Sequence, residues 1–180
     1  MKVIEDDEIL TLIADPKQLD RGFKYLMVKY QEPLYWHIRR MVKSHEDTDD
    51  VLQNTFIKVY KNIKRFESKS KLFTWLYKIA TNESITFLNK RKKKRTESID
   101  EQSSLNNMAT SDSVDGDELM LKLNRAISIL PTKQKLVFNM RYYDEMTYDQ
   151  ISAVLGTSVG GLKASYHHAV KKIESFIKEE

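Results

Sequence analysis

The chain has 180 residues, 41% of them hydrophobic and 31% charged, with a net charge of +4. It contains no cysteine, which excludes disulfides and thiolate metal sites. With only 5 Gly and 3 Pro, the composition favours helices over a turn-rich β architecture, and no apolar run approaches the roughly 20 residues that span a bilayer. We therefore expect an all-α protein without direct membrane insertion.

The charge is divided into three blocks along the chain. Residues 1–95 hold 21 Lys and Arg against 13 Asp and Glu, residues 96–117 hold 6 acids and no base, and residues 118–180 hold 9 bases against 7 acids. The middle block is rich in Ser, Asp and Asn, so it cannot offset the entropy cost of ordering by burying apolar surface. We expect two small helical domains joined by a flexible acidic linker at 96–117.

Before the linker, the hydrophobic pattern predicts four helices. The first is interrupted near Pro33, because proline is tolerated in the first turn of a helix but not inside one. Asp47 or Thr48 can cap the third helix. A loop, KRFESKSK, leads to a long fourth helix that ends in six consecutive bases. The expected ranges are residues 19–30, 34–42, about 48–63 and 72–91.

Acidic and amide side chains gather where the third helix begins, in the sequence HEDTDDVLQNTF. Carboxylates such as Asp49 and Asp50 favour the positive end of a helix dipole, which is a sufficient structural explanation for them. The Asp and His spacing matches no metal-binding loop geometry, and the adjacent His167 and His168 diverge by about 100° on a helix. No glycine phosphate loop, nucleophile elbow or two-histidine zinc motif is present, so we expect no catalytic residue, metal or cofactor.

Cations, amides and aromatic rings combine around the start of the fourth helix. Cations and amides on one helix face suit phosphate contacts and base hydrogen bonds, although a solvated face has the same pattern. Phe66 and Trp75, with Phe73 and Tyr77, are interleaved with Lys and Arg, and such rings can stack on unpaired bases. Core packing is the alternative for each ring. The polar face of this helix comprises Lys71, Thr74, Lys78, Asn82, Asn89 and Lys92.

The second domain opens with a helix from about Glu118 that Pro131 breaks, and Thr132 can cap the next helix, 133–142. Residues 147–177 then have the layout of a helix-turn-helix. Thr147 begins a capping box with the glutamine three residues later. A glycine, Gly156, can end the first helix in the left-handed conformation, and a serine two residues on can cap the second.

The second helix of this motif has an outward face of small and basic residues, since its apolar stripe begins at Leu162 and follows helical spacing. Small residues let the backbone approach DNA, and the positive helix end favours phosphate. A helical hairpin that only packs on partners would carry the same basic face. The residues that we expect to face DNA are Gly160, Gly161, Lys163, Ala164, His167, His168 and Lys171.

Taken in chain order, these segments resemble an extracytoplasmic-function sigma factor of the sigma-70 superfamily. The part similar to the family's core-binding helix and melting region is DTDDVLQNTFIKVYKNIKRF, and the part similar to its minus-ten segment is SKLFTWLYKIATNESITFLNKRKKK. The part similar to its minus-thirty-five domain is LNRAISILPTKQKLVFNMRYYDEMTYDQISAVLGTSVGGLKASYHHAVKKIE. The resemblance implies a non-enzymatic initiation factor that binds core RNA polymerase, directs it to promoters and helps to melt DNA.

The resemblance also implies roles for the matching positions, with domain 1–95 as region 2 and domain 118–180 as region 4. The second helix of the helix-turn-helix would enter the major groove with the outward face named above, and the loop 66–71 would hold a base flipped from the non-template strand. The helix that grips the polymerase would use Asp49, Asp50, Gln53 and Phe56. The residues at the minus-ten element would be Lys64, Phe66, Lys69, Lys71, Thr74, Lys78, Asn82 and Asn89.

The partners that the resemblance implies are core RNA polymerase, through the coiled coil of its largest subunit and its beta flap, and promoter DNA, both duplex and single-stranded. It also implies a cytoplasmic protein and an anti-sigma factor, often membrane-anchored, and no small-molecule substrate. The acidic linker would thread the polymerase toward the RNA exit channel. The alternative is a free-standing helix-turn-helix regulator that binds a palindrome as a dimer, but no long heptad seam is present for the dimer.

Four positions depart from the pattern of the family. Asn54 stands where the core-binding helix often has an acid. The recognition helix reads GGLKASYHH where many members read GTVKSRLHR, so that Ala164 replaces a common serine, and Ser165 and His168 replace arginines. Because a bidentate arginine contact is worth about 1–3 kcal/mol of base discrimination, these changes alter which promoter sequence is preferred.

Overall fold

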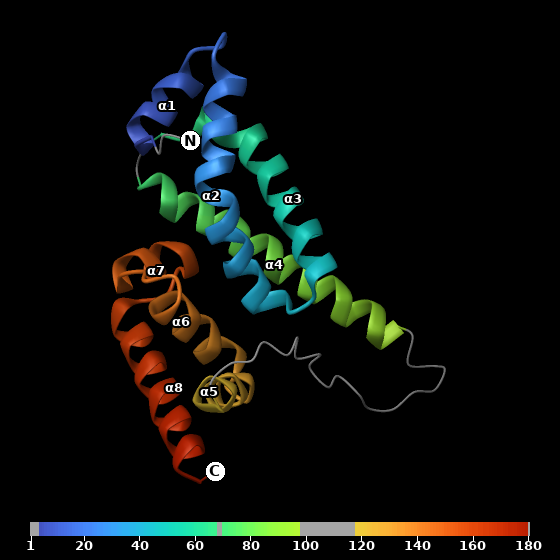
Figure 1. Ribbon diagram of the computed structural model, residues 1–180, viewed down its shortest axis with the longest axis vertical. Coiled ribbons are helices and arrows are strands. Elements are labelled where there is room, and N and C mark those ends of the chain that lie inside the picture. Colours follow the sequence, from blue (N-terminus) through green and yellow to red (C-terminus); the bar gives the residue numbers. More distant parts are fainter. Residues whose placement is uncertain (1–3, 68–69, 98–117, 180) are drawn as a thin grey trace. The chain divides into compact units, whose positions relative to one another are not determined.

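The computed structural model describes residues 4–67, 70–97 and 118–179. The chain divides into two compact units, Met1–Asp100 and Glu101–Glu180. Each is built from helices (Figure 1), and the described residues contain no strand, which confirms the all-α prediction. Most of the predicted linker, at 98–117, lies outside the described residues.

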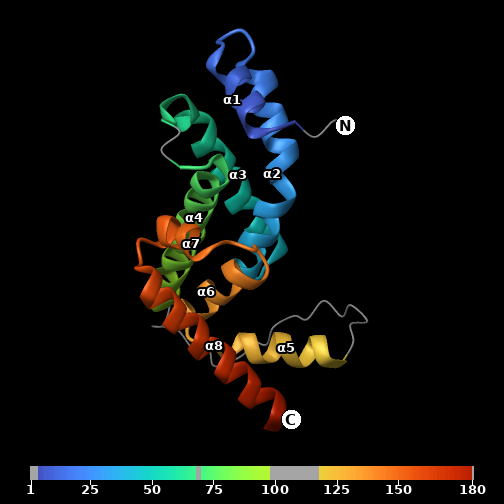
Figure 2. The ribbon, with the colours of Figure 1, turned by 90° about the vertical axis from the view of Figure 1, so that its left-hand side faces the viewer.

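In the first unit, the long helix α2 is the central element. It packs against α1, α3 and α4, and α3 also packs against α4 (Figures 1 and 2). Leu26, Leu34 and Ile38 of α2 are completely buried, as are Val59 of α3 and Leu76 of α4. The elements are α1 (Asp6–Ala14), α2 (Leu19–Val42), α3 (His45–Asn62), a 3-10 turn η1 (Ile63–Arg65) and α4 (Leu72–Glu97).

The predicted break near Pro33 was wrong, because α2 runs through that residue without interruption. Pro33 is exposed to solvent, while Tyr30, Leu34 and Ile38 form a buried face that continues past it. The loss of one backbone hydrogen bond at the proline is outweighed by this continuous buried face, since tertiary packing supplies most helical stability.

The start of α3 also differs from the prediction. The N-cap is Ser44, whose side chain accepts a hydrogen bond from the Asp47 backbone N–H at 3.4 Å. Asp47 and Thr48 are therefore inside the helix rather than capping it, and Thr48 is fully buried. The Asp47 carboxylate instead pairs with Arg91 of α4 at 2.9 Å, which fastens the two helices together.

The N-terminal helix α1 was not predicted. Its Ile9 and Ile13 are buried in the first unit, where α1 packs on α2. Tyr30 of α2 donates a hydrogen bond to Asp6 at 2.8 Å, and Lys29 pairs with the same carboxylate. Burial and then this hydrogen bond raise the pKa of Tyr30 above its usual value. With only two buried positions in nine residues, the amphipathic pattern was too short to stand out.

Gly22 lies where α1 and α2 approach each other closely. A Cβ atom added there would lie 2.8 Å from Ile13 Cγ1 and 2.9 Å from the Ile13 backbone nitrogen. We expect Gly22→Ala to lower the free energy of unfolding of the first unit by about 1–3 kcal/mol, because the two helices must separate to admit the methyl group. Urea titration followed by tryptophan fluorescence measures this unit alone, since both tryptophans, Trp36 and Trp75, belong to it.

The matched control for this substitution is Gly160→Ala in the second unit. A Cβ at Gly160 would meet no atom within 4 Å. We expect the free energy of unfolding of this variant to equal that of wild type or to rise by up to about 1 kcal/mol, because alanine has a better helix propensity than glycine. Urea titration followed by circular dichroism measures it. A Gly22→Ala protein as stable as wild type would contradict the close packing of α1 on α2.

In the second unit, α8 packs against each of the other three helices. The buried cluster contains Ala126, Ile127, Leu130, Phe138, Ala169 and Ile173. The elements are α5 (Glu118–Ser128), α6 (Thr132–Tyr142), α7 (Tyr148–Leu155) and α8 (Val159–Glu179). Pro131 is the N-cap of α6, so Thr132 is its first residue and not its cap as predicted.

The helix-turn-helix geometry follows the prediction closely. The Thr147 backbone N–H donates to Gln150 Oε1 at 2.7 Å and the Gln150 N–H donates to Thr147 Oγ1 at 3.2 Å, which completes the capping box. Gly156 ends α7 with φ of 65°, a conformation that glycine adopts without strain. Ser158 accepts a hydrogen bond from the Gly161 N–H at 3.3 Å, as expected of a cap for α8.

Candidate polymerase and promoter interfaces

A groove of about 450 Å³ runs between α2 and α3 of the first unit. Its apolar lining comes from both helices, and its polar edge includes Asp49 and Gln53. Phe56 is only 6% exposed and lines the groove, where its ring meets Phe23 edge to face at 6.3 Å. The full lining is Phe23, Met27, Gln31, Asp49, Leu52, Gln53, Phe56, Ile57, Tyr60 and Lys61.

The polar residues predicted on α3 differ in whether they already have a hydrogen-bond or ion-pair partner within the chain. Asp49 Oδ2 lies 3.5 Å from His45 Nδ1, and that nitrogen is 2.8 Å from the Tyr35 hydroxyl. Asp50 and Gln53 are exposed and have no hydrogen-bond or ion-pair partner among the described residues. Their polar atoms are therefore available to a partner molecule.

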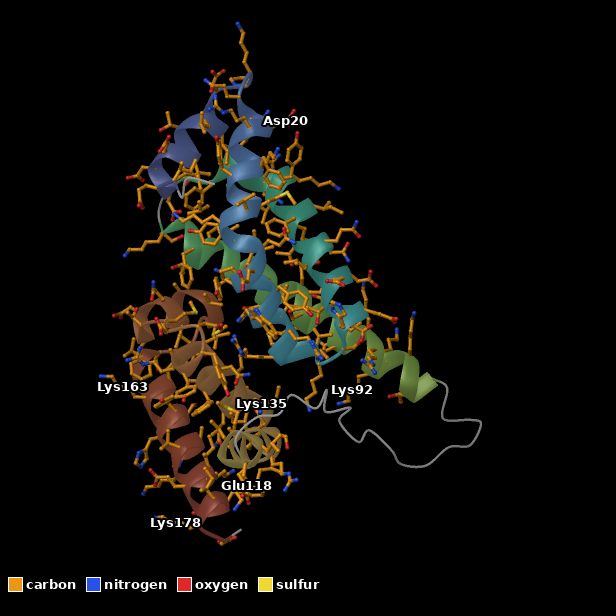
Figure 3. All side chains as sticks on the ribbon, viewed as in Figure 1. Asp20, Lys92, Glu118, Lys135, Lys163 and Lys178 are labelled. Carbon is orange, nitrogen blue, oxygen red and sulfur yellow. The ribbon has the colours of Figure 1, made fainter. Side chains whose placement is uncertain are left out.

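One end of the groove is fixed by a hydrogen bond between its two helices. The Tyr60 hydroxyl of α3 donates to Asp20 Oδ1 at 3.1 Å, near the N-terminal end of α2 (Figure 3). Because the carboxylate accepts this bond, the pKa of the Tyr60 phenol is raised. The ring of Tyr60 also meets Phe23 at 4.9 Å. A hydrogen bond and a ring contact therefore join the two walls of the groove at this end.

Sequence reasoning missed the contribution of α2 to this groove. Phe23 and Met27 are four residues apart and therefore lie on one face of the helix. That spacing was the available signal, but it is the same in a helix that is simply buried. Ile57 and Tyr60, 45% and 42% exposed, extend the apolar surface along α3.

The predicted polar face of α4 is largely exposed, with one exception. Lys71, Lys78, Asn82 and Asn89 are accessible, and so is Lys92 toward the end of the helix (Figure 3). Thr74 is only 5% exposed and faces the core, so its inclusion in the polar face was wrong. Its side chain is small enough to be enclosed where α4 packs on its neighbours, and we exclude it from the DNA-contacting set.

The aromatic residues around the start of α4 divide into two pairs. Phe66 and Trp75 are half-buried, with ring centroids 5.3 Å apart, next to the exposed Lys64 and Lys71. Phe73 lies 4.3 Å from Tyr77, which is 2% exposed and belongs to the core. In the first pair both rings are partly accessible together with exposed cations, whereas in the second pair Tyr77 is buried. Lys69, also predicted here, lies outside the described residues.

All the residues predicted on the outward face of α8 are exposed, while Leu162 and Ala169 are completely buried. His167 and His168 have ring centroids 6.0 Å apart and planes inclined by 57°, as expected of neighbours on a helix. Lys163 lies in the N-terminal part of α8 (Figure 3). The periodicity therefore placed this face correctly, and its role stays a prediction.

The described residues offer neither a metal centre nor a membrane span. No group of three His, Cys, Asp or Glu side chains in 4–67, 70–97 and 118–179 could hold a metal ion. Within the same ranges, every helix is too short or too polar to cross a bilayer.

The sequence matches two regions of one family. It matches Sigma-70 region 2 over residues 26–94 and Sigma-70 region 4 over residues 120–173. It is 28% identical to the ECF RNA polymerase sigma factor SigW of Bacillus subtilis, over 91% of this chain and 95% of that protein. It is 26% identical to the ECF RNA polymerase sigma-E factor of Salmonella typhimurium, over 88% of this chain and 87% of that protein.

Two solved structures share the fold. One is the sigma factor RpoE in complex with the anti-sigma factor NepR from Bartonella quintana, with a TM-score of 0.71, 21% identity and coverage of 88% of this chain and 98% of the other. The second is CnrH in complex with the cytosolic domain of CnrY, with a TM-score of 0.72, 19% identity and coverage of 97% and 98%. Since both regions match in order, the chain belongs to the extracytoplasmic-function sigma factors of the sigma-70 family, promoter-specific transcription initiation factors that bind core RNA polymerase and promoter DNA.

Proposed function

We propose that the two units divide the work of initiation, the first binding polymerase and opening the minus-ten element, and the second reading the minus-thirty-five element. The observation that carries this proposal is that the matched regions fall one in each unit. The first unit presents exposed polar and basic side chains on α3 and α4, and the second presents them on α8. A free-standing dimeric regulator is not favoured, because it would leave the first of these regions without a role.

Polymerase binding is assigned to the groove between α2 and α3. A helical partner can place apolar side chains against Phe56 and Met27, while the unpaired Asp50 and Gln53 at the surface of α3 take its polar groups. The coiled coil of the largest polymerase subunit has the elongated helical form that such a groove accepts. The beta flap is assigned to the second unit by resemblance alone.

Strand opening is assigned to the surface formed by the loop after η1 and the start of α4. Phe66 and Trp75 offer half-buried rings on which an unpaired base can stack. Lys71 and Lys78 are exposed cations for the phosphates of the same strand, and Asn82 can donate to and accept from a base edge. Lys64 and Asn89 extend this surface in either direction.

An anti-sigma factor is proposed as a further partner. The support is that RpoE, one of the two solved structures described above, is in complex with the anti-sigma factor NepR, and that CnrH, the other, is in complex with the cytosolic domain of CnrY. Such a partner would compete with polymerase for exposed apolar side chains, among which Ile57 and Tyr142 are 45% and 51% exposed. Attachment of the protein to the membrane would then depend on the partner.

The division of labour is tested by footprinting the holoenzyme on the promoter upstream of the gene for this chain. We expect Lys78→Ala with Asn82→Ala to lose strand opening at the minus-ten element and keep upstream protection. Lys163→Ala with Lys171→Ala should lose protection at the minus-thirty-five element, because these cations lie on the outward face of α8. Loss of the same footprint in both variants would contradict the assignment of one promoter element to each unit.

A further inference from the structure

The ring of Tyr148 lies close to two cationic side chains of the second unit. The guanidinium of Arg141, at the end of α6, lies 5.4 Å from the centroid of the Tyr148 ring. The ammonium of Lys163, in the first turns of α8, lies 5.9 Å from the same centroid. Both distances are within the range in which the ring quadrupole attracts a cation. Neither Arg141 nor Tyr148 belongs to the DNA-binding set predicted from the sequence.

The ring itself is held in place from two sides. Tyr148 is the first residue of α7, directly after the Thr147 capping box, which fixes its backbone. Tyr166 of α8 meets its ring edge to face at 6.3 Å and is itself stacked on the buried Phe138 at 5.8 Å. The half-buried ring of Tyr148 is therefore connected to the core of the unit through Tyr166 and Phe138.

The charge of the two cations is not neutralised by any carboxylate within residues 118–179. Arg141 Nη1 donates to the Met146 carbonyl at 2.9 Å, which anchors the guanidinium and occupies one of its five donors. Neither Arg141 nor Lys163 forms an ion pair with a carboxylate among the described residues. Lys163 lies in the first turns of α8, and Arg141 at the end of α6 shares the Tyr148 ring with it. Together with the positive end of the α8 dipole, these two cations favour an anion, and the backbone phosphates of DNA are the anions next to α8 in the proposed complex.

We infer that Tyr148 is a positioning residue, whose ring holds Lys163 and Arg141 as a preorganised pair for DNA phosphates beside the recognition helix. This inference rests on the proposed reading of the minus-thirty-five element by α8. A lysine side chain has many rotamers, and holding its ammonium on a ring reduces the entropy lost when the phosphate is bound. Phosphate contacts carry no sequence information, so this pair sets affinity and register rather than promoter choice.

The test uses the full chain and a random-sequence DNA duplex at low salt, with binding followed by fluorescence anisotropy. Tyr148→Phe keeps the ring, and we expect a Kd within about twofold of wild type, whereas Tyr148→Leu should weaken binding by about three- to fivefold. In a protein that already carries Arg141→Gln and Lys163→Gln, we expect Tyr148→Leu to cause no further increase in the Kd for DNA. Removing both cations should reduce the steepness of the slope of log K against the logarithm of salt concentration by about 2, as expected for the loss of two phosphate contacts.

Two results would overturn the inference. One is an equal loss for Tyr148→Phe and Tyr148→Leu, which would place the effect on the hydroxyl. The other is an undiminished loss for Tyr148→Leu in the background without the cations, which would indicate a general change of fold. Helix content by circular dichroism accompanies each variant. Run-off transcription with the wild-type chain tests the proposed function separately. If that chain directs core polymerase to no promoter, the proposed function is refuted, whatever effect the Tyr148 variants have on DNA binding.

Discussion

Asp50→Lys is expected to weaken binding of the chain to core RNA polymerase by about 30-fold or more. Asp50 is exposed on α3 beside the apolar groove and has no partner among the described residues, so its carboxylate is available to a cation of the polymerase. Placing a lysine against that cation costs about 2 kcal/mol or more at a desolvated interface, and about 1.4 kcal/mol is tenfold in Kd. Titration of labelled chain with core polymerase measures the change.

The matched control is Glu8→Lys, which makes the same change of charge on α1. Glu8 is exposed and lies outside the lining of the groove. We expect this variant to bind polymerase within about twofold of wild type, because long-range effects of one surface charge are largely screened at physiological salt. Equal weakening by the two substitutions would show that net charge alone, rather than the α3 surface, governs binding.

Phe66→Ala is expected to slow open-complex formation by about tenfold or more while leaving polymerase binding intact. The substitution removes the ring that lies 5.3 Å from Trp75, and with it one side of the surface proposed to stack the flipped base. Stacking on an aromatic side chain is worth about 1–3 kcal/mol per base, which corresponds to this range of rates. The rate is measured with a fluorescent base analogue in the minus-ten element.

A template with an unpaired minus-ten element provides the second arm of this experiment. Since unpairing is already complete there, we expect the defect of Phe66→Ala to shrink to a few-fold. Trp36→Ala is the control, because Trp36 is a 50% exposed aromatic of the same unit that lies on α2. A Phe66→Ala holoenzyme that opens the duplex at the wild-type rate would remove this ring from the melting surface.

Local signals in the sequence were sufficient for the helix-turn-helix. Thr147 and Gln150, Gly156 and Ser158 each act within a few residues of their own position, and each makes the predicted contact or adopts the predicted conformation. The course of α2 through Pro33 could not be read in this way. It depends on burial against three other helices, and that information is distributed over the whole unit.

The candidate sites likewise include some features that one segment of the sequence predicts and others that depend on several helices. Helical periodicity placed the exposed face of α8 and most of the polar face of α4, because one buried stripe fixes the opposite side. It failed for Thr74, a small polar residue at the edge of the stripe that packing encloses. The groove between α2 and α3, and the ring of Tyr148 under two cations, bring together residues from separate helices. Neither arrangement has a signature in a single segment.

Run-off transcription by purified core RNA polymerase, with and without this chain, tests promoter-specific initiation most directly. On the promoter upstream of its own gene, we expect a transcript of defined start only when the chain is added. Asp50→Lys and Phe66→Ala should each reduce it, and Glu8→Lys and Trp36→Ala should not. If the chain directs core polymerase to no promoter in a genomic library, the assignment of promoter-specific initiation to this protein is contradicted.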